Sequence, residues 1–558
     1  MQHSCAQCRA PFEITQDDLA FYDKLSPIIG GKKQSIPPPT FCPDCRQQRR
    51  LAWRNERKLY RRTCDLSGET MLSMYAPGSP FPVYGRDAWF GDGWDPRKFG
   101  REYDLSRPFF EQFQELQKTV PRLALVSAHN ENCDYCNVVG NCRNCFLIFG
   151  SIRCEDCYYG NPYYCENCVD SLVLRNSQQC YECTDSEKLY ECSFCQNCGN
   201  SQNLQFCFEV TNSHHCFGCS DIARKEYCLW NEQLTKKEYE RRVGEFDLQD
   251  PRVIEEIWKK LAALKVRTAK KYYVGYGNEN VTGDYIFHSK DCRAVFNADR
   301  CQDLAYCSQV LEVKDGMDAI CSEEAELVYE VSGGYGVSSC AFSHWCWDNA
   351  HGLLYCSICT QDVKDCFGCI SLRHAQHCIL NKQYTKEEYE ALVPTVIDSM
   401  RSRGEWGEFF PAKLSPSTYN ETIASDYFPL SKEQAQERGY PWNDALPYTQ
   451  GKETKTWDAI PQSISDVPDT FTQEVLACTA CGKNYKIIPQ ELAFLKQRNL
   501  PLPRKCPDCR YVRRLASRNP RKLWARTCNM CKKTIQTSYA PERPEIVYCG
   551  ECYVNTVY

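Results

Sequence analysis

The sequence lacks the features of a membrane or secreted protein. Its 558 residues contain no run of about 18 apolar residues, so we expect no transmembrane helix and no membrane partner. The first residues, MQHSCAQCRAPF, include neither the basic n-region nor the apolar h-region of a signal peptide. We therefore expect a cytoplasmic protein in a reducing compartment.

Catalytic motifs are also missing. The chain has nine histidines and no Walker-type glycine loop, no His-Glu-x-x-His and no Gly-x-Ser-x-Gly. Its Cys-x-x-Cys pairs lack the thioredoxin-like βαβ context of a redox motif. His214, His215 and His344 lie near cysteines, so a Cys/His dyad or a mixed-ligand zinc site is an alternative, but positions in a loop or on a solenoid face explain them more simply. We predict no enzyme activity, no catalytic residue and no small-molecule substrate.

Cysteine, in contrast, is abundant, with 41 residues. An odd number cannot all pair as disulfides, and in a reducing compartment Cys-x-x-Cys pairs more often bind metal. Charge is unevenly distributed, because residues 1–64 carry a net +6 and residues 476–558 a net +11. Since the whole chain carries −5, residues 65–475 carry −22. The two basic ends are therefore candidates for binding an anionic partner.

Both ends contain Cys-x-x-Cys pairs at the spacing of zinc sites. Zinc prefers four thiolates at tetrahedral corners, and each Cys-x-x-Cys turn supplies two of them. All-cysteine sites leave no open position for water, which favours a structural over a catalytic role. We predict about three Zn²⁺ sites, with the ligand sets Cys5, Cys8, Cys42 and Cys45, then Cys478, Cys481, Cys506 and Cys509, and finally Cys528, Cys531, Cys549 and Cys552. The alternative is a set of buried free cysteines.

A fourth site begins at Cys64 and is incomplete. Residues 42–64 match residues 506–528 at 17 of 23 positions, which aligns Cys64 with Cys528. The other three ligand positions hold Ser67, Gly85 and Ala88. We expect the ribbon fold to persist there without metal, with the aromatic segment WFGDGWDP (89–96) filling the space.

The segment CTACGKNYKIIPQELAFLKQRNLPLPRKCPDCRYVRR (478–514) resembles the family called probable zinc-ribbon domain. In that family a Cys-x-x-Cys-Gly knuckle precedes Cys-Pro-x-Cys-Arg and further arginines. Residues 5–50 resemble it with an insert and without the glycine. The whole layout is similar to uncharacterised cysteine-rich proteins of small-genome bacteria, some of them labelled acyl-CoA transferases. The resemblance implies zinc ribbons at both ends and no particular activity.

A basic element follows the Cys-Pro-Asp-Cys knuckle at each end. Arginines there alternate with leucine, tryptophan and tyrosine, which favours phosphate contacts and base stacking, with RNA slightly ahead of DNA. Asn519-Pro520 further predicts a short helix from about residue 520. In the alternative interpretation the arginines pair with the acidic middle of the same chain or dock a protein. The residues expected to bind nucleic acid are Arg49, Arg50, Arg54, Arg57, Lys58, Arg61, Arg510, Arg513, Arg514, Arg518, Arg521, Lys522 and Arg526.

The middle of the chain contains two cysteine-rich arrays. In residues 133–231 the cysteines at 133, 154, 180, 207 and 228 are separated by 20–27 residues, with short β-prone stretches between them. This pattern predicts a mainly β protein in which parallel β-solenoid coils stack on one another. Cysteine is small enough to fill such a core. We favour packing for most array cysteines, and the alternatives are further zinc sites or thiol chemistry.

The second array ends as the first does. Residues 216–243 and 366–393 agree at 13 of 28 positions, which indicates a duplication with a period of 150 residues. Each copy closes with Thr-Lys-x-Glu, which predicts a helix starting at Thr235 or Thr385 that caps the solenoid. Residues 250–267 predict a further amphipathic helix.

These observations divide the chain into six segments. They are an N-terminal zinc ribbon (1–64), a degenerate second ribbon with linker (65–130), the first array with its capping helices (131–284), the second array with its capping helix (285–395), an irregular linker (396–475) and tandem C-terminal ribbons (476–558). The resulting hypothesis is a non-catalytic zinc-binding scaffold that binds nucleic acid, RNA or a ribonucleoprotein, through its basic ends. The alternatives are a protein-interaction scaffold that uses acidic solenoid faces, and a thiol-based metal store or redox sensor.

Overall fold

The computed structural model describes residues 1–557, except for the side chain of Ser322. The chain forms two compact units. The first unit joins Met1–Leu125 to Tyr273–Ala445, and the second joins Val126–Tyr272 to the residues that follow Ala445. Each unit therefore combines one array with one pair of ribbons. The N-terminal ribbons belong with the second array, and the C-terminal ribbons belong with the first.

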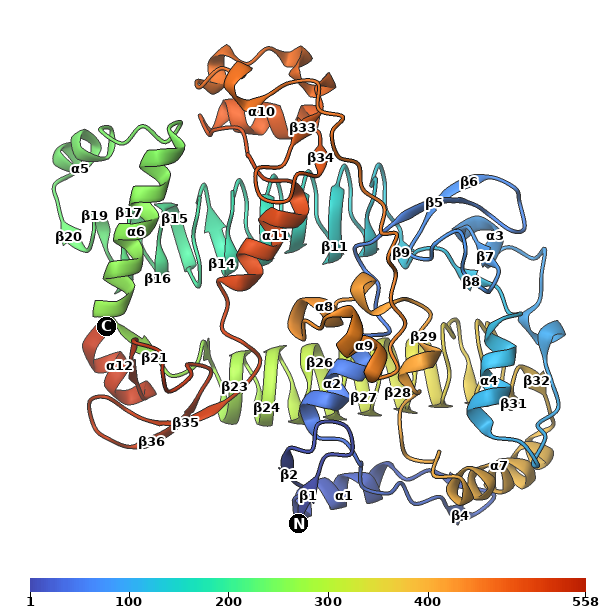
Figure 1. Ribbon diagram of the computed structural model, residues 1–558. Helices are drawn as coiled ribbons and strands as arrows, with labels where there is room; N and C mark the ends of the chain where they lie inside the picture. Colours follow the sequence, from blue (N-terminus) through green and yellow to red (C-terminus); the bar gives the residue numbers. More distant parts are fainter. Residues whose placement is uncertain (558) are drawn as a thin grey trace. The chain divides into compact units, whose positions relative to one another are not determined.

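Both arrays are parallel β-solenoids, as predicted (Figure 1). The first array consists of β9 (Ser127–Ala128), β10 (Asn137–Gly140), β11 (Phe146–Ile152), β12 (Tyr158–Tyr163), β13 (Val169–Arg175), β14 (Thr184–Tyr190), β15 (Gly199–Gln205), β16 (Phe208–Thr211), β17 (His214–Phe217), β18 (Ser220–Ala223), β19 (Glu226–Leu229) and β20 (Glu232–Gln233). Its strands pair in parallel except for the closing pair β19–β20, which is antiparallel.

The second array has the same design and also closes with an antiparallel pair. It consists of β22 (Gly275–Tyr276), β23 (Glu279–Phe287), β24 (Lys290–Asp299), β25 (Gln302–Ala305), β26 (Ser308–Met317), β27 (Ile320–Tyr329), β28 (Ser332–Ala341), β29 (His344–Leu354), β30 (Lys364–Phe367), β31 (Cys378–Ile379) and β32 (Lys382–Gln383).

The coil is shorter than the cysteine intervals indicate. Leu172 pairs with Thr184, and Gln202 pairs with His214, so the chain advances by twelve positions in one coil. Some coils are one position shorter, as in the pairing of Tyr158 with Val169, and others are one position longer. The cysteine intervals that predicted the solenoid therefore each span about two coils.

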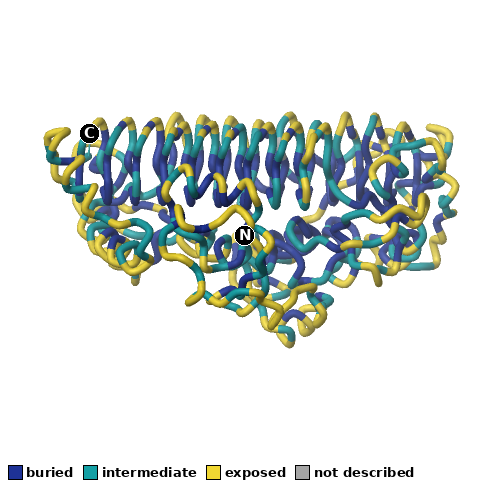
Figure 2. Tube along the Cα trace, turned by 90° about the horizontal axis from the view of Figure 1, so that it is seen from above, coloured by how far each residue is buried: buried dark blue, intermediate teal, exposed yellow. Residues whose placement is uncertain are grey.

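A regular backbone bend produces this short coil. Through most of both arrays every third residue has a positive φ near 50°, as at Asn197, Asn200 and Asn203. Asn and Asp tolerate this left-handed region better than most residues, and they are frequent at these corners. The chain turns at each of these residues, and four such corners complete one coil. Figure 2 shows the interior of the coils buried and many corners exposed.

Cysteines fill the interior of the first array. They stack in columns at the coil period, and the longest column holds Cys133, Cys145, Cys157, Cys168, Cys180 and Cys192. Each of these thiols donates a hydrogen bond to the carbonyl two residues before it, as Cys157 Sγ does to Glu155 O at 3.3 Å. Within residues 1–557, no array cysteines bring three sulfurs within 4.8 Å of one another. This geometry favours packing over metal binding for the array cysteines.

Helices cover the ends and sides of each solenoid. The predicted starts at Thr235 and Thr385 are confirmed, because each threonine side chain accepts a hydrogen bond from the N–H three residues later. The helices are α5 (Lys236–Val243), α6 (Pro251–Arg267) in the second unit and α4 (Phe109–Gln117), α7 (Lys386–Ser402), α8 (Ala424–Tyr427) and α9 (Lys432–Glu437) in the first. None of the helices in residues 1–557 combines the length and apolar character needed to span a bilayer.

Apart from one hairpin, the two pairs of ribbons consist of the same elements in the same order. The N-terminal pair holds β1 (Gln2–Ser4), β2 (Pro11–Glu13), α1 (Gln16–Leu25), β3 (Ile28–Ile29), β4 (Lys32–Lys33), α2 (Pro43–Leu51), β5 (Tyr60–Thr63), β6 (Thr70–Ser73), β7 (Val83–Tyr84) and α3 (Arg86–Phe90), and β7 pairs with β8 (Arg122–Leu123). The C-terminal pair lacks the β3–β4 hairpin and holds β33 (Leu476–Ala477), β34 (Asn484–Tyr485), α10 (Pro489–Gln497), α11 (Pro507–Ala516), β35 (Trp524–Thr527), β36 (Thr534–Thr537), β37 (Ile546–Tyr548) and α12 (Gly550–Val557), and β37 pairs with β21 (Ala269–Lys271).

The prediction of a short helix from about residue 520 is wrong. The basic element starts instead as α11, which begins at Pro507 inside the Cys-x-x-Cys knuckle and ends at Ala516. Proline is favourable in the first helical turn because its missing N–H has no partner there. The residues after Pro520 lead into the strand β35.

Candidate metal centres and arginine ladders

Three groups of four cysteines lie where the sequence predicts metal sites. Within each group the four sulfurs lie within 4.8 Å of one another. The groups are the predicted ones, namely Cys5, Cys8, Cys42 and Cys45, then Cys478, Cys481, Cys506 and Cys509, and finally Cys528, Cys531, Cys549 and Cys552. In each group the first two ligands follow a β-strand, and the second pair lies at or inside a helix start.

The distances between sulfurs fit a tetrahedral ion. One sulfur pair in each group is separated by 3.7–3.8 Å, namely Cys8–Cys42, Cys481–Cys506 and Cys531–Cys549. A tetrahedron of four sulfurs with Zn–S bonds of about 2.3 Å has edges of about 3.8 Å. The three groups can therefore hold a metal ion, and their chemistry and size are consistent with zinc.

Backbone amides point at one sulfur of each group. Three equivalent N–H···Sγ hydrogen bonds of 3.3 Å run from Cys42 to Cys5, from Cys506 to Cys478 and from Cys549 to Cys528. Burial raises the pKa of Cys528, but the amide donors outweigh it and lower that pKa to about 6. The same balance lowers the pKa of Cys478 to about 6. These cysteines therefore favour the thiolate, which is the form that ligates metal.

The incomplete ribbon at Cys64 keeps the fold of its complete counterpart. The hairpin β5–β6 pairs Tyr60 with Ser73, as β35–β36 pairs Trp524 with Thr537. Cys64 Sγ still accepts hydrogen bonds from the backbone N–H of Ser67 at 3.4 Å and of Gly85 at 3.3 Å. Trp89, next to the last ligand position, is fully buried against the rings of Phe90 and Trp94. Aromatic packing therefore stabilises this ribbon in place of four metal ligands.

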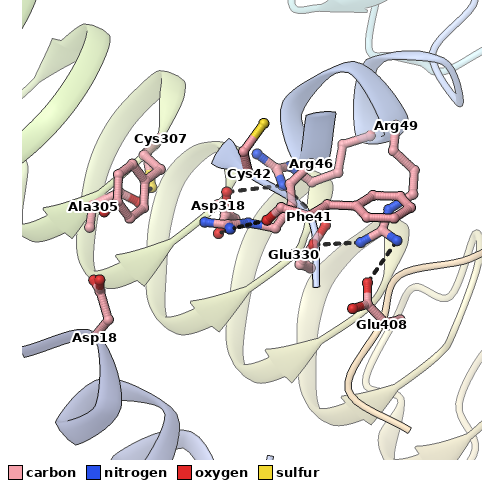
Figure 3. Close-up of polar contacts among 12 residues, drawn as sticks. Asp18, Phe41, Cys42, Arg46, Arg49, Ala305, Cys307, Asp318, Glu330 and Glu408 are labelled. Atoms are coloured by element: carbon pink, nitrogen blue, oxygen red, sulfur yellow. Dashed lines mark hydrogen bonds and ion pairs between the residues drawn. The ribbon is translucent and has the colours of Figure 1, made fainter. Parts of the chain in front are cut away.

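The basic helix α2 of the first unit lies against the second array (Figure 3). Arg46 Nε lies 2.8 Å from Asp318 Oδ2, and Arg50 Nη1 lies 3.2 Å from Asp318 and 3.0 Å from Glu330. Arg49 reaches Glu330 at 2.8 Å and Glu408 at 2.9 Å. All three arginines are buried, with Arg46 and Arg50 each 1% exposed. We call this set of contacts an arginine ladder.

The helix α11 of the second unit makes the same ladder on the first array. Arg510 pairs with Asp170, and Arg514 Nη1 lies 2.9 Å from Asp170 and 3.4 Å from Glu182. The guanidinium groups of Arg510 and Arg46 also lie over equivalent tyrosine rings, those of Tyr159 and Tyr306. The basic element present near both ends of the chain therefore forms the same contact twice.

Matching repeat lengths explain why the ladder forms. Arginines four residues apart on a helix are separated by about 6 Å along its axis. Neighbouring strands of a parallel sheet lie about 4.8 Å apart. The second carboxylate of each ladder lies one coil further along the chain than the first, Glu182 after Asp170 and Glu330 after Asp318. A helix that runs along the solenoid can therefore place successive arginines beside successive carboxylates.

The structure places most of the predicted nucleic-acid residues of the helices in these contacts. Arg49, Arg50, Arg510 and Arg514 are buried in the ladders, and Arg513 also pairs with Glu182 from a half-exposed position. Arg518 pairs with Asp185 at 2.6 Å, whereas Arg54 pairs with its neighbour Glu56. The contacts correspond to the alternative interpretation, in which arginines pair with the acidic middle of the chain. The remaining predicted residues are Arg57, Lys58, Arg61, Arg521, Lys522 and Arg526, which are partly or fully exposed.

Reasoning from the sequence did not identify the acidic residues of the ladders. Asp170, Glu182, Asp318 and Glu330 are four of 72 acidic residues, and nothing in their immediate neighbourhood marks them. The signal that could have found them is the coil period, because the cysteines of the column from Cys133 to Cys192 recur at a nearly constant interval. An Asp and a Glu separated by the same interval then lie on the same face.

Comparison with known proteins adds little to this geometry. No family model matches the chain, and no curated protein matches it. A solved structure described as "putative acetyltransferase from Desulfovibrio desulfuricans G20" aligns with 45% of this chain and 65% of its own at 7% identity, with a TM-score of 0.10. At that score the likeness supports no conclusion about fold or activity. The resemblance to zinc ribbons stays a prediction.

Proposed function

We propose that the protein is a non-catalytic scaffold whose ribbons bind zinc. The proposal rests on three four-cysteine groups in which all sulfurs lie within 4.8 Å of one another and one pair in each group lies 3.7–3.8 Å apart, the edge length of a zinc tetrahedron. The metal would be held by four thiolates and would have no free position for substrate. Its role would be to fix the ribbons, and with them the ladder helices, whose first turns contain two ligands each.

Elemental analysis of the reduced full-length protein tests this proposal. We expect about three zinc ions per chain. Cys528→Ser should lower the content to about two, because a structural site with three thiolates loses most of its affinity. The matched control is Cys64→Ser, which changes the equivalent cysteine of the incomplete ribbon and should leave zinc content unchanged. Equal zinc loss in both variants, or no zinc in the wild type, would contradict the proposal.

A second candidate function is nucleic-acid binding by the C-terminal hairpin β35–β36 and the residues before it. Lys522, Lys532 and Lys533 are exposed there, and Trp524 is partly exposed. Exposed cations beside an aromatic ring are the groups that contact phosphates and stack on bases in single strands. This proposal moves the predicted binding surface from the buried ladder arginines to the hairpin.

Binding of a fluorescent single-stranded RNA, measured by anisotropy at several salt concentrations, tests the second candidate. Replacing Lys522, Lys532 and Lys533 by Gln should weaken binding and reduce the slope of log affinity against log salt by roughly 0.7 for each lost phosphate contact. The control is the triple replacement of Lys236, Lys237 and Lys259 by Gln on α5 and α6, which should leave binding unchanged. Equal effects of both triple variants would indicate non-specific attraction and reject the hairpin as the site.

A further inference from the structure

A buried cation without a counter-charge lies in the first unit. Arg122, in β8, is fully buried, and among residues 1–557 none of its three guanidinium nitrogens has a hydrogen-bond or ion-pair partner. The guanidinium lies 4.8 Å from the centre of the Phe81 ring and 5.8 Å from that of Tyr75. Burial lowers the pKa of Arg122, yet a guanidinium is not deprotonated in proteins. The site therefore carries a positive charge.

The two aromatic rings compensate this charge only in part. A cation–π contact attracts a guanidinium more weakly than water solvates it, and a buried charge ordinarily has an ionic partner. The Tyr75 hydroxyl lies close enough to interact with the Arg122 guanidinium, but no hydrogen bond of normal geometry joins the two groups. The guanidinium is thus left without an ionic acceptor among the described residues.

In the second unit, Lys270 occupies the position equivalent to Arg122. In the first unit β7 places Val83 opposite Arg122, and in the second unit β37 places Val547 opposite Lys270. Lys270 is also fully buried, but it pairs with the buried carboxylate of Asp221. Glu209 lies one coil earlier on the same solenoid face, where burial, and after it the charge of Asp221, raises its pKa well above the usual range and favours the neutral carboxyl. The equivalent cation of the second unit is therefore neutralised within the chain.

The second array has no carboxylate at the equivalent position. With a period of 150 residues, Asp221 corresponds to Ser371. Ser371 lies in the equivalent place, since its hydroxyl donates to the carbonyl of Pro121, next to Arg122, at 2.8 Å. Ile358 lies one coil before Ser371, also has a positive φ, and corresponds to Glu209. Neither replacement carries a charge.

A second unpartnered polar group lies on the same side of the array. The side chain of His344 is 1% exposed, and its Nε2 has no partner among the described residues. Burial, and after it the charge of Arg122, lowers the pKa of His344, so its imidazole stays neutral. The Trp53 ring packs edge-on against it, and the Trp53 Nε1 is also buried without a partner within the described part of the chain. Three side chains therefore hold hydrogen-bonding groups whose partners are not supplied by residues 1–557.

We infer that the first unit binds a small inorganic anion beside Arg122, in the position that the Asp221 carboxylate takes beside Lys270 in the second unit. A halide ion or a small oxyanion has the required chemistry, because it accepts hydrogen bonds from the guanidinium and neutralises its charge. The anion would be a structural ligand of the fold, separate from the metal centres and from the ladders.

Unfolding of the full-length protein in chloride and in gluconate, at equal ionic strength, tests the inference. We expect the unfolding midpoint of the wild type to rise with chloride concentration, because a ligand that binds only the folded state stabilises it. Ser371→Asp supplies the missing carboxylate, so it should raise the midpoint in gluconate and abolish the chloride dependence. The reciprocal variant Asp221→Ser should create an additional anion dependence in the second unit. In bromide-soaked crystals an anomalous peak should lie beside Arg122.

Two results would overturn the inference. The first is a wild-type midpoint that is equal in chloride and gluconate. The second is a Ser371→Asp variant that lowers the midpoint and keeps the chloride dependence of the wild type, because the anion would then bind elsewhere. Arg122→Leu separates folding from binding, since it should remove the chloride dependence even where it changes the midpoint itself.

Discussion

In the arginine ladder of the second unit, we expect a large loss of folding stability when the carboxylate of Asp170 is replaced by an amide. Asp170→Asn keeps the size of the side chain and removes its charge. Asp170 pairs with both Arg510 and Arg514, and these arginines are only 2% and 4% exposed. The variant therefore leaves two buried guanidinium groups with one carboxylate fewer.

The expected magnitude follows from the contacts that remain. Removing one partner of a buried ion pair costs about 3–5 kcal/mol. Arg510 keeps Glu491 at 2.8 Å, and Arg514 keeps Glu182 at 3.4 Å, so neither arginine is fully unpaired. We therefore expect a loss near the lower end of that range, about 3 kcal/mol in the free energy of unfolding of this unit. Asp318→Asn should cause a loss of the same order in the first unit.

Urea unfolding of the full-length variants measures this effect, with hydrogen exchange of β12–β14 reporting the second unit separately. A double variant, Asp170→Asn with Arg514→Met, should lose less than the sum of the single variants, because the two residues interact directly. Glu155→Gln is the control, since its exposed pair with Arg143 should contribute no measurable stability. A loss below about 0.5 kcal/mol for Asp170→Asn would refute the view that the ladder holds the ribbon on the solenoid.

Two further predictions concern acid stability and the backbone. Burial raises the pKa of Glu408, but the charge of Arg49 outweighs it and holds that pKa below its usual range. The pair therefore contributes its full stability above the unfolded-state pKa of about 4.3, and this contribution is lost as the pH falls through the folded-state pKa. The difference in stability between the wild type and Glu408→Gln should therefore shrink in acid titrations below about pH 4. Gly160 has φ of +153°, and a Cβ there would lie 2.0 Å from the carbonyl oxygen of Ser171. Gly160→Ala should therefore destabilise the first array by more than about 2 kcal/mol in urea unfolding, whereas Gly140→Ala, where the nearest atom is at 3.9 Å, should change stability by less than about 1 kcal/mol. Equal effects of the two alanine variants would contradict this interpretation of the coil.

The local features of the fold could be predicted from the sequence. The four-cysteine sets are correct because each Cys-x-x-Cys turn is a local unit and its spacing alone brings two sulfurs together. The capped helix starts at Thr235 and Thr385 are correct because capping depends on three neighbouring residues. The solenoid was also predicted, since repeated cysteines separated by short β-prone stretches indicate stacked coils.

The sequence-based prediction did not identify the period of the coil. Cysteines sit at several positions of each coil, so their spacings mix steps within a coil with steps between coils. Only the pairing of residues such as Leu172 and Thr184 assigns the step from one coil to the next. Without that step, the acidic residues that share one face of the solenoid could not be recognised.

The sequence by itself therefore determined the four-cysteine sets, the solenoid class and the helix caps, because each of them appears as a regular spacing of residues along the chain. The tertiary structure alone decided what the basic helices contact. Arg514 and Asp170 lie far apart in the sequence, and they meet because the helical rise between arginines is close to the spacing of the coils. A run of arginines has the same charge whether it faces a phosphate or a buried carboxylate, so its role is set by the surface that the fold places beside it.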